Sequence, residues 1–211
     1  MNKRIITISR EFGSGGRTIG KLLADKLGIK YYDKELVKKI SLETGFDPAY
    51  IEEHGEYSQG KSFLSYVFSH GAAGHPGAMN GMTNADFLWC MQRKVILELA
   101  DKEPCIIVGR CADYILKDRE DCLHVFIHAP KEQRAERIVK LYGESSDAPM
   151  KRLDDKDTRR RVNYRHFTGR EWGQAQNYQI SLDSGVLGLE GSADLIASIY
   201  RHDIHGLAGQ K

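Results

Sequence analysis

The chain has 211 residues, of which 41% are hydrophobic and 28% charged, and its 31 basic and 29 acidic side chains give a formal net charge of +2. This composition excludes collagen-like, disordered and disulfide-scaffold proteins, and no apolar run approaches the roughly 18 residues that a membrane span needs. We therefore expect residues 1–211 to form one cytoplasmic globular domain, a monomer or homodimer, that binds neither membranes nor polymeric nucleic acid.

Short β-branched runs alternate with amphipathic segments in the first part of the chain. Residues 5–9 predict a buried strand, and the apolar spacing over residues 19–27 predicts a helix directly after it. A second strand is expected over residues 29–32. Further along, Asp47-Pro48 is typical of a helix N-terminus, with proline at the first helical position.

The same alternation continues beyond residues 54–84, a stretch rich in Gly, Ser and His that predicts a flexible loop. Helices are expected over residues 86–100, 113–116, 131–141 and 189–200, and strands over residues 105–108, 122–128 and 178–182. Strands that alternate with helices predict an α/β fold, a parallel five-stranded sheet with helices on both faces. Asp183-Ser184-Gly185, which follows the last strand, is interpreted as a turn.

A glycine-rich turn separates the first strand from the first helix, where α/β proteins bind phosphate through backbone N–H groups and the helix N-terminus. Arg17 stands where the P-loop pattern G-x-x-x-x-G-K-S/T has lysine, and Thr18 where it has the Mg²⁺-binding hydroxyl, whereas Glu11 replaces its first glycine. The alternative is an ordinary turn without a ligand. The predicted phosphate-binding residues are Gly13, Ser14, Gly15, Gly16, Arg17 and Thr18.

A second basic region, residues 142–172, predicts a lid that closes over transferring phosphates. Its arginines are Arg152, Arg159, Arg160, Arg161 and Arg165. On a helix, Arg161 and Arg165 share a face. The alternative is a helix laced with surface ion pairs.

Asp33 and Arg110 follow the second and third predicted strands, at the sheet edge where open parallel sheets bind ligands. Asp33 is a candidate acceptor of hydrogen bonds from a substrate hydroxyl or amine, and Arg110 a candidate ligand of a phosphate or a base. Each residue alone is more often a member of a structural salt bridge.

The chain resembles the nucleoside monophosphate kinases, and among them the bacterial cytidylate kinase-like family. The resemblance rests on residues 8–17, Tyr32-Asp33, Gly109-Arg110, residues 157–165, Phe167-Thr168-Gly169 and residues 182–185. It implies a three-layer P-loop NTPase-like fold with an acceptor-side insertion over about residues 45–100.

By this resemblance, residues 13–18 would hold the phosphates of ATP together with Mg²⁺, with Thr18 near the ion, and Asp33 and Arg110 would hold the acceptor nucleotide. Arg17, Arg161 and Arg165 would act on the transferring phosphoryl group. The implied reaction is transfer of the γ-phosphoryl group of ATP to CMP or dCMP.

Two alternatives remain open because of Glu11, Arg17 and an insertion, residues 54–84, that is unlike that of ordinary cytidylate kinases. One alternative is a kinase of the same fold that acts on a non-nucleotide small molecule. The other is a nucleotide-sensing module that binds without turnover.

Overall fold

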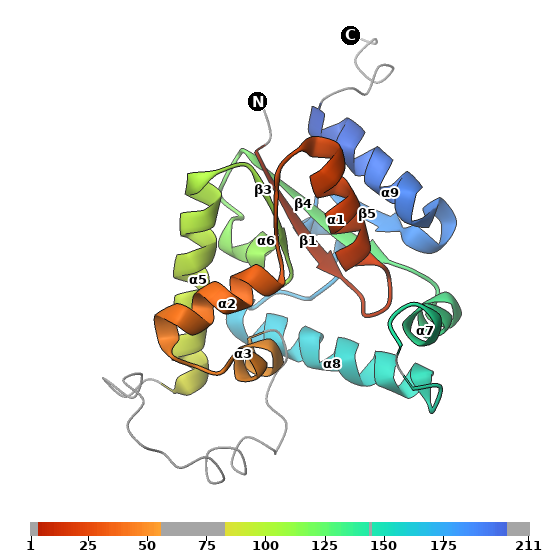
Figure 1. Ribbon diagram of the computed structural model, residues 1–211, viewed down its shortest axis with the longest axis horizontal. Coiled ribbons are helices and arrows are strands. Elements are labelled where there is room, and N and C mark those ends of the chain that lie inside the picture. The colour runs from red at the N-terminus through yellow and green to blue at the C-terminus, as the bar shows by residue number, and fades with distance from the viewer. Residues whose placement is uncertain (1–3, 56–82, 144, 202–211) are drawn as a thin grey trace.

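Five parallel strands form the centre of the molecule in the computed structural model, which describes residues 4–55, 83–143 and 145–201 (Figure 1). They are β1 (Ile5–Arg10), β2 (Lys30–Tyr32), β3 (Cys105–Val108), β4 (Cys122–His128) and β5 (Ile180–Asp183). Their order across the sheet is β2-β3-β1-β4-β5, with every neighbouring pair parallel. This confirms the predicted sheet and its strand direction.

Alternating side chains of the strands enter two separate hydrophobic cores, one on each face of the sheet. Ile5 faces the core beneath α2 (Lys34–Thr44), α3 (Pro48–His54), α5 (Asn84–Lys102) and α6 (Ala112–Ile115). Ile6 and Ile8 face the opposite core, which α1 (Gly16–Leu27) and α9 (Ser184–Arg201) cover. All six residues of β1 are buried, as expected of a strand covered on both faces. The fold therefore has the predicted three layers.

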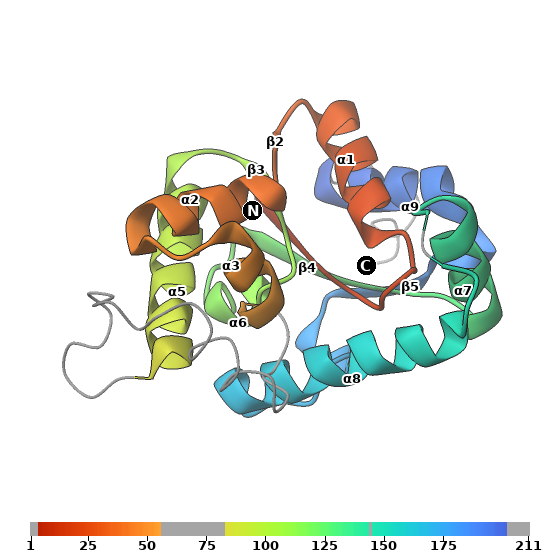
Figure 2. The ribbon, with the colours of Figure 1, turned by 60° about the horizontal axis from the view of Figure 1, so that its bottom comes forward.

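Two further helices, α7 (Lys131–Lys140) and α8 (Pro149–Thr168), lie at the carboxyl end of the sheet. Figure 2 shows α8 as a long rod across the bottom of the molecule, with α7 at one end of it. The predicted lid segment is therefore mostly one 20-residue helix. A short 3₁₀ turn, Ala175–Asn177, leads from α8 to β5.

The end of the chain differs from its prediction in register. β5 lies two residues later than expected at its start, and the turn predicted at residues 183–185 is wrong because Ser184 is the first residue of α9. The early start of α9 is possible because Gly188, at φ +69° and ψ 174°, kinks the helix there. The predicted loop over residues 54–84 lies almost wholly outside the described residues.

A buried hydrogen-bonded group fixes α8 to the sheet. The hydroxyls of Ser9 and Tyr164 donate to the two carboxylate oxygens of Asp113, at 3.1 and 2.7 Å. Burial raises the pKa of Asp113, although both hydrogen bonds act in the opposite direction. The Asp113 carboxylate thus connects α6 to both β1 and α8. Among the described helices, none is long and apolar enough to cross a membrane.

Asp113→Asn is expected to remove a pH dependence of stability. Because the pKa of Asp113 is higher in the folded than in the unfolded chain, the folded state binds the proton more tightly, and stability falls as pH rises from the ordinary 3.8 through the raised value. Urea unfolding across this range measures the effect. The stability of the variant relative to the wild type should increase with pH.

The matched control is Asp118→Asn, which removes an exposed carboxyl that pairs with Lys117. This substitution should change stability by less than about 1 kcal/mol, because the Asp118 side chain is 87% exposed. A stability difference between Asp113→Asn and the wild type that does not change with pH would contradict the assigned role of the buried carboxyl.

Candidate functional site

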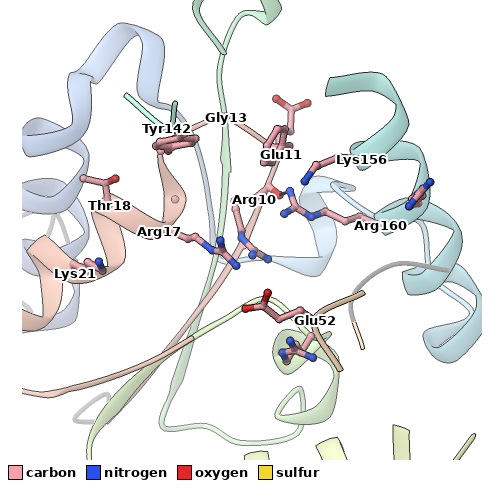
Figure 3. Close-up of a pocket in the computed structure, with 15 residues that line it drawn as sticks. Arg10, Glu11, Gly13, Arg17, Thr18, Lys21, Glu52, Tyr142, Lys156 and Arg160 are labelled. Atoms are coloured by element: carbon pink, nitrogen blue, oxygen red, sulfur yellow. Dashed lines mark hydrogen bonds between the residues drawn. The ribbon is translucent and has the colours of Figure 1, made fainter. Parts of the chain in front are cut away.

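A cleft of about 640 Å³ opens beside the carboxyl end of β1 and the N-terminus of α1 (Figure 3). Among the described residues, seven cationic side chains line it together with two carboxylates, those of Glu11 and Glu52. The cations are Arg10, Arg17, Lys21, Arg110, Lys156, Arg159 and Arg160. A concave surface with this charge favours ligands that carry several negative charges.

The glycine-rich turn forms one wall of the cleft. Gly13 and Gly15 have φ angles of +79° and +87°, a backbone conformation that favours glycine. A Cβ atom at Gly16 would lie 2.7 Å from the Cβ atom of Arg10, so only glycine allows this close approach. In the described chain, no side chain caps the N-terminus of α1. Its amide groups are therefore available to an anion, in agreement with the prediction.

Thr18 and Arg17 line the cleft as predicted, whereas Ser14 does not. The Ser14 hydroxyl donates to the carbonyl oxygen of Glu11 at 2.9 Å, and the Ser14 N–H also points to that oxygen at 3.3 Å. The hydroxyl of Ser184 donates to the Ser14 carbonyl at 2.5 Å. Ser14 therefore stabilises the turn, and its predicted contact with phosphate stays a prediction.

Glu11, at the position of the first P-loop glycine, joins the turn to the segment after β4. Its carboxylate accepts a hydrogen bond from the N–H of Ala129 and pairs with the Nε atom of Arg134, both at 3.3 Å. Burial raises the pKa of Glu11, and the charge of Arg134 partly offsets this. Glu11, which departs from the P-loop pattern, thus attaches the glycine-rich turn to the segment after β4 and to α7.

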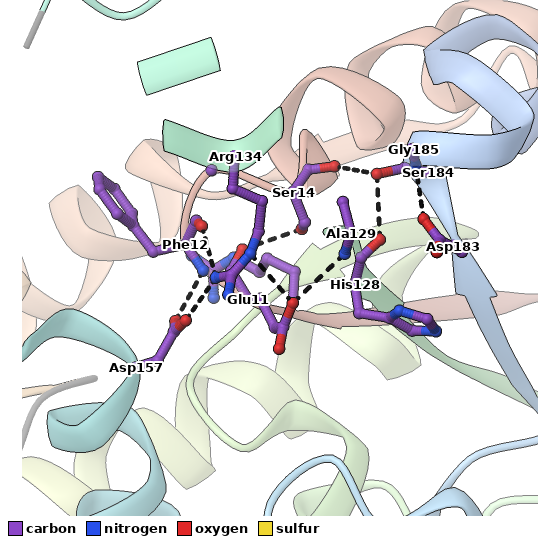
Figure 4. A network of polar contacts seen from close by, with 12 residues as sticks. Glu11, Phe12, Ser14, His128, Ala129, Arg134, Asp157, Asp183, Ser184 and Gly185 are labelled. Carbon is purple, nitrogen blue, oxygen red and sulfur yellow. Dashed lines mark hydrogen bonds and ion pairs between the residues drawn. The ribbon is translucent and has the colours of Figure 1, made fainter. Parts of the chain in front are cut away.

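Phe12 is held through both of its backbone polar groups by α7 and α8 (Figure 4). Its N–H donates to Asp157 of α8 at 2.7 Å, and its carbonyl accepts from Arg134 of α7 at 3.0 Å. Arg134 and Asp157 also form a buried ion pair at 2.6 Å. The glycine-rich turn and the two helices therefore act as one unit.

The ring of Phe12 in turn places two cations of α8 beside the cleft. The Nζ atom of Lys156 lies 4.6 Å from the ring centroid, and the guanidinium carbon of Arg160 lies 5.8 Å from it. Both distances are within the range of cation–π attraction. Arg160 also donates to the carbonyl oxygen of Arg10 at 3.1 Å. Lys156, Arg159 and Arg160 are three and four residues apart, so one helix face carries them all.

Arg161 and Arg165, the arginines predicted to contact phosphates, do not line the cleft. Both are exposed, and Arg165 pairs with Glu171 at 3.0 Å. The two do share a helix face, but the buried contacts of Asp157 and Arg160 turn a different face of α8 toward the cleft. Within the described chain, Lys156, Arg159 and Arg160 are the basic residues of α8 that line the cleft, and the phosphate contacts of Arg161 and Arg165 stay a prediction.

Arg110 lines the cleft from the side opposite the glycine-rich turn. Its Nη1 atom donates to Oε1 of Gln92 at 2.7 Å and to the carbonyl oxygen of Ile51 at 3.2 Å. Arg110 has a φ of +56° and Cys111 one of +53°, which is unusual for residues other than glycine and typical of functional sites. Gln92 and Ile51 thus hold a strained arginine in position.

Asp33, predicted to bind the acceptor, is not among the residues that line the cleft. It forms an ion pair with Arg17 instead, with 3.0 Å between Oδ2 and Nε. Of the lining residues that the sequence analysis missed, Arg10 could have been found because it ends the first strand. Glu52 had no comparable signal, because it lies on α3, away from any strand end.

Comparisons with known proteins agree with this geometry. The model of the cytidylate kinase-like family matches residues 5–186. The chain is 23% identical over 212 residues to a cytidylate kinase of Pyrococcus horikoshii, covering all of this chain and 95% of the relative.

Two solved structures are similar in fold. A protein of Eubacterium ventriosum, described as uncharacterised, has a TM-score of 0.69 and 24% identity, over 94% of this chain and 99% of the other. A shikimate kinase from Acinetobacter baumannii in complex with shikimate has a TM-score of 0.55 and 17% identity, over 96% of each chain. These likenesses support the P-loop kinase fold.

Asp157→Asn is expected to destabilise the protein by about 3 kcal/mol, because it leaves the buried charge of Arg134 with only its longer ion pair to Glu11, at 3.3 Å. The matched control on the same helix is Asp154→Asn, which removes an exposed ion pair with Lys131 and should change stability by less than about 1 kcal/mol. Chemical denaturation measures both. Equal effects of the two substitutions would contradict the role of Asp157 as the buried anchor of α8.

Proposed function

We propose that this kinase, which belongs to the cytidylate kinase-like family, transfers the γ-phosphoryl group of ATP to a nucleoside monophosphate. CMP or dCMP is the acceptor we propose, because the family model and the curated relative carry that name. The reaction yields ADP and the nucleoside diphosphate. It needs positioning and charge neutralisation more than a covalent nucleophile.

The observation that carries the proposal is the excess of cations in the cleft. In the part of the chain that the structure describes, seven basic side chains line the cleft with two carboxylates, and they come from the region of the glycine-rich turn, from α8 and from the segment after β3. A triphosphate donor and a monophosphate acceptor together present roughly five to six negative charges, which matches this excess. A singly charged carboxylic acid as acceptor would bring about one negative charge fewer than a nucleoside monophosphate.

On the donor side, the amide groups at the start of α1 and the side chain of Arg17 would hold the phosphates of ATP. Mg²⁺ fits the donor set, because Thr18 offers a hydroxyl and this ion is usually carried by phosphate oxygens and water. Within the described residues, no group of three or more His, Cys, Asp or Glu side chains is placed to hold a metal. The ion would therefore arrive with the nucleotide and neutralise charge on its phosphates.

On the lid side, Lys156, Arg159 and Arg160 would neutralise the charge that develops on the transferring phosphoryl group. On the acceptor wall, Arg110 would bind the monophosphate, since Gln92 and Ile51 already hold its guanidinium. The acceptor phosphate is deprotonated at neutral pH and needs no general base. Five of the seven described lining cations, all except Arg10 and Lys21, thus have a proposed role in charge compensation.

A kinase of a non-nucleotide metabolite is the second candidate, and Glu52 is the observation that favours it. Figure 3 shows its carboxylate directed into the cleft, opposite Arg10 and Arg17. A carboxylate there could accept the proton of an alcohol acceptor, a step that a phosphate acceptor does not need. The acceptor assay below separates the two candidates.

The direct test is ADP release from Mg²⁺-ATP with CMP, dCMP, UMP, AMP, GMP, a sugar acid or no acceptor. We expect fast release with CMP or dCMP and only background release with the sugar acid. Stimulation by the sugar acid alone, lost in Glu52→Gln, would favour the second candidate. No stimulation by any acceptor, with ATP binding intact, would contradict both and point to a sensing module.

Arg159→Ala is expected to lower turnover by about tenfold or more, because it removes a lid cation from the cleft. Arg161, two residues further along α8, provides a matched control, since it is exposed and lies outside the cleft lining. Arg161→Ala should leave turnover within about twofold of the wild type. Steady-state kinetics with saturating ATP and acceptor measure both. A larger loss of turnover in Arg161→Ala than in Arg159→Ala would show that Arg161, and not Arg159, acts on the phosphates.

A further inference from the structure

The side chain of Asp33 is directed to an arginine rather than to its own helix. Asp33 immediately precedes α2, yet its carboxylate forms no side-chain cap on that helix within the described chain. Instead Oδ2 lies 3.0 Å from the Nε atom of Arg17, with the Asp33 side chain only 11% exposed and that of Arg17 49% exposed. The carboxylate is therefore the better shielded member of the pair, and the guanidinium extends toward solvent and the cleft.

Tyr31 supports this pair from the preceding strand. Its hydroxyl lies 3.5 Å from Oδ2 of Asp33 and 3.4 Å from the carbonyl oxygen of Arg17. The ring lies against Gly20 of α1, where a Cβ atom would be 2.8 Å from Tyr31 Cε2. Burial and the charge of Asp33 raise the pKa of Tyr31, so its hydroxyl stays protonated at neutral pH. β2 and α1 thus meet around Asp33.

The chemistry of guanidinium explains what this contact achieves. A guanidinium is planar and has N–H groups along its Nε edge and around its two terminal nitrogens. An ion pair through Nε fixes the plane of the group and leaves terminal N–H groups for a second anion. Lysine in the same place would be a point charge without a fixed orientation. Arg17 lines the cleft, whereas Asp33 does not, so Asp33 acts on the cleft through Arg17.

We infer that Asp33 is a positioning residue, which orients the Arg17 guanidinium toward the phosphates of the donor nucleotide and does not bind the acceptor. The inference rests on the proposed function, because it takes ATP as the donor. It also explains why arginine stands in the lysine position of the P-loop, since only the guanidinium can be oriented through Nε. Asp33 and Arg17 then form one functional pair across β2 and α1.

A double-mutant cycle tests the inference, using Arg17→Lys, Asp33→Asn and the double variant of the full chain. The first readout is the Kd of a non-hydrolysable ATP analogue with Mg²⁺, measured by calorimetry. The second is the KM of the acceptor nucleotide. We expect Asp33→Asn to weaken analogue binding about tenfold in the wild-type background and less than about twofold in the Arg17→Lys background, with acceptor KM unchanged.

Two further variants keep the result interpretable. Asp25→Asn removes an exposed carboxyl of α1 and should leave analogue binding unchanged. Tyr31→Phe keeps both charges of the pair and removes only the hydroxyl beside them. It tests whether a local disturbance near Asp33 and Arg17 is enough to weaken analogue binding. A loss of analogue binding equal to that of Asp33→Asn would overturn the inference. Thermal unfolding of each variant shows whether it is folded.

Several outcomes would overturn the inference. One is an equal loss of analogue binding from Asp33→Asn in both backgrounds. Another is a raised acceptor KM with unchanged analogue binding, which would make Asp33 an acceptor ligand. If the wild type itself binds no ATP analogue, the proposed function fails and the positioning role fails with it. Normal wild-type binding that Asp33→Asn leaves unaltered refutes only the positioning role.

Discussion

The buried ion pair between Arg134 and Asp157 is the contact on which the arrangement of the cleft depends. Both side chains are almost fully shielded from water, and both also bind the backbone of Phe12. A buried charge is costly unless it is paired and hydrogen-bonded, so this pair strongly favours one position of α8 relative to the glycine-rich turn. The position of the Phe12 ring, and of Lys156 and Arg160 beside it, follows from that contact.

The same contact brings like charges close together. Arg10, Arg17 and Arg160 converge in the cleft (Figure 3), and the two lining carboxylates do not balance them and the other lining cations. Such a site is less stable without an anion than with one, and a ligand that supplies the missing charge stabilises the folded protein. The unbalanced charge of the cleft thus has a cost in stability that a bound anion would offset. In the positioning role inferred above, Asp33 sets the orientation of one of these cations, the Arg17 guanidinium.

Local signals in the sequence were enough to predict the sheet, the first helix and the glycine-rich turn. β-branched runs, helical spacing and glycines each act over a few residues, so they are visible without the fold. The orientation of α8 was not predictable in this way, because Asp157 and not an apolar stripe decides which face is buried. The partner of Asp33 and the inward direction of Glu52 depend likewise on how distant elements pack.

In the proposed function, one cleft holds a triphosphate donor and a monophosphate acceptor together. The most direct measurement is calorimetric binding of a bisubstrate analogue in which adenosine and cytidine are joined through a pentaphosphate. The account predicts one analogue bound per chain, at least about tenfold more tightly than either nucleotide alone, because one molecule then engages both walls of the cleft. Binding no tighter than that of ATP would contradict the account.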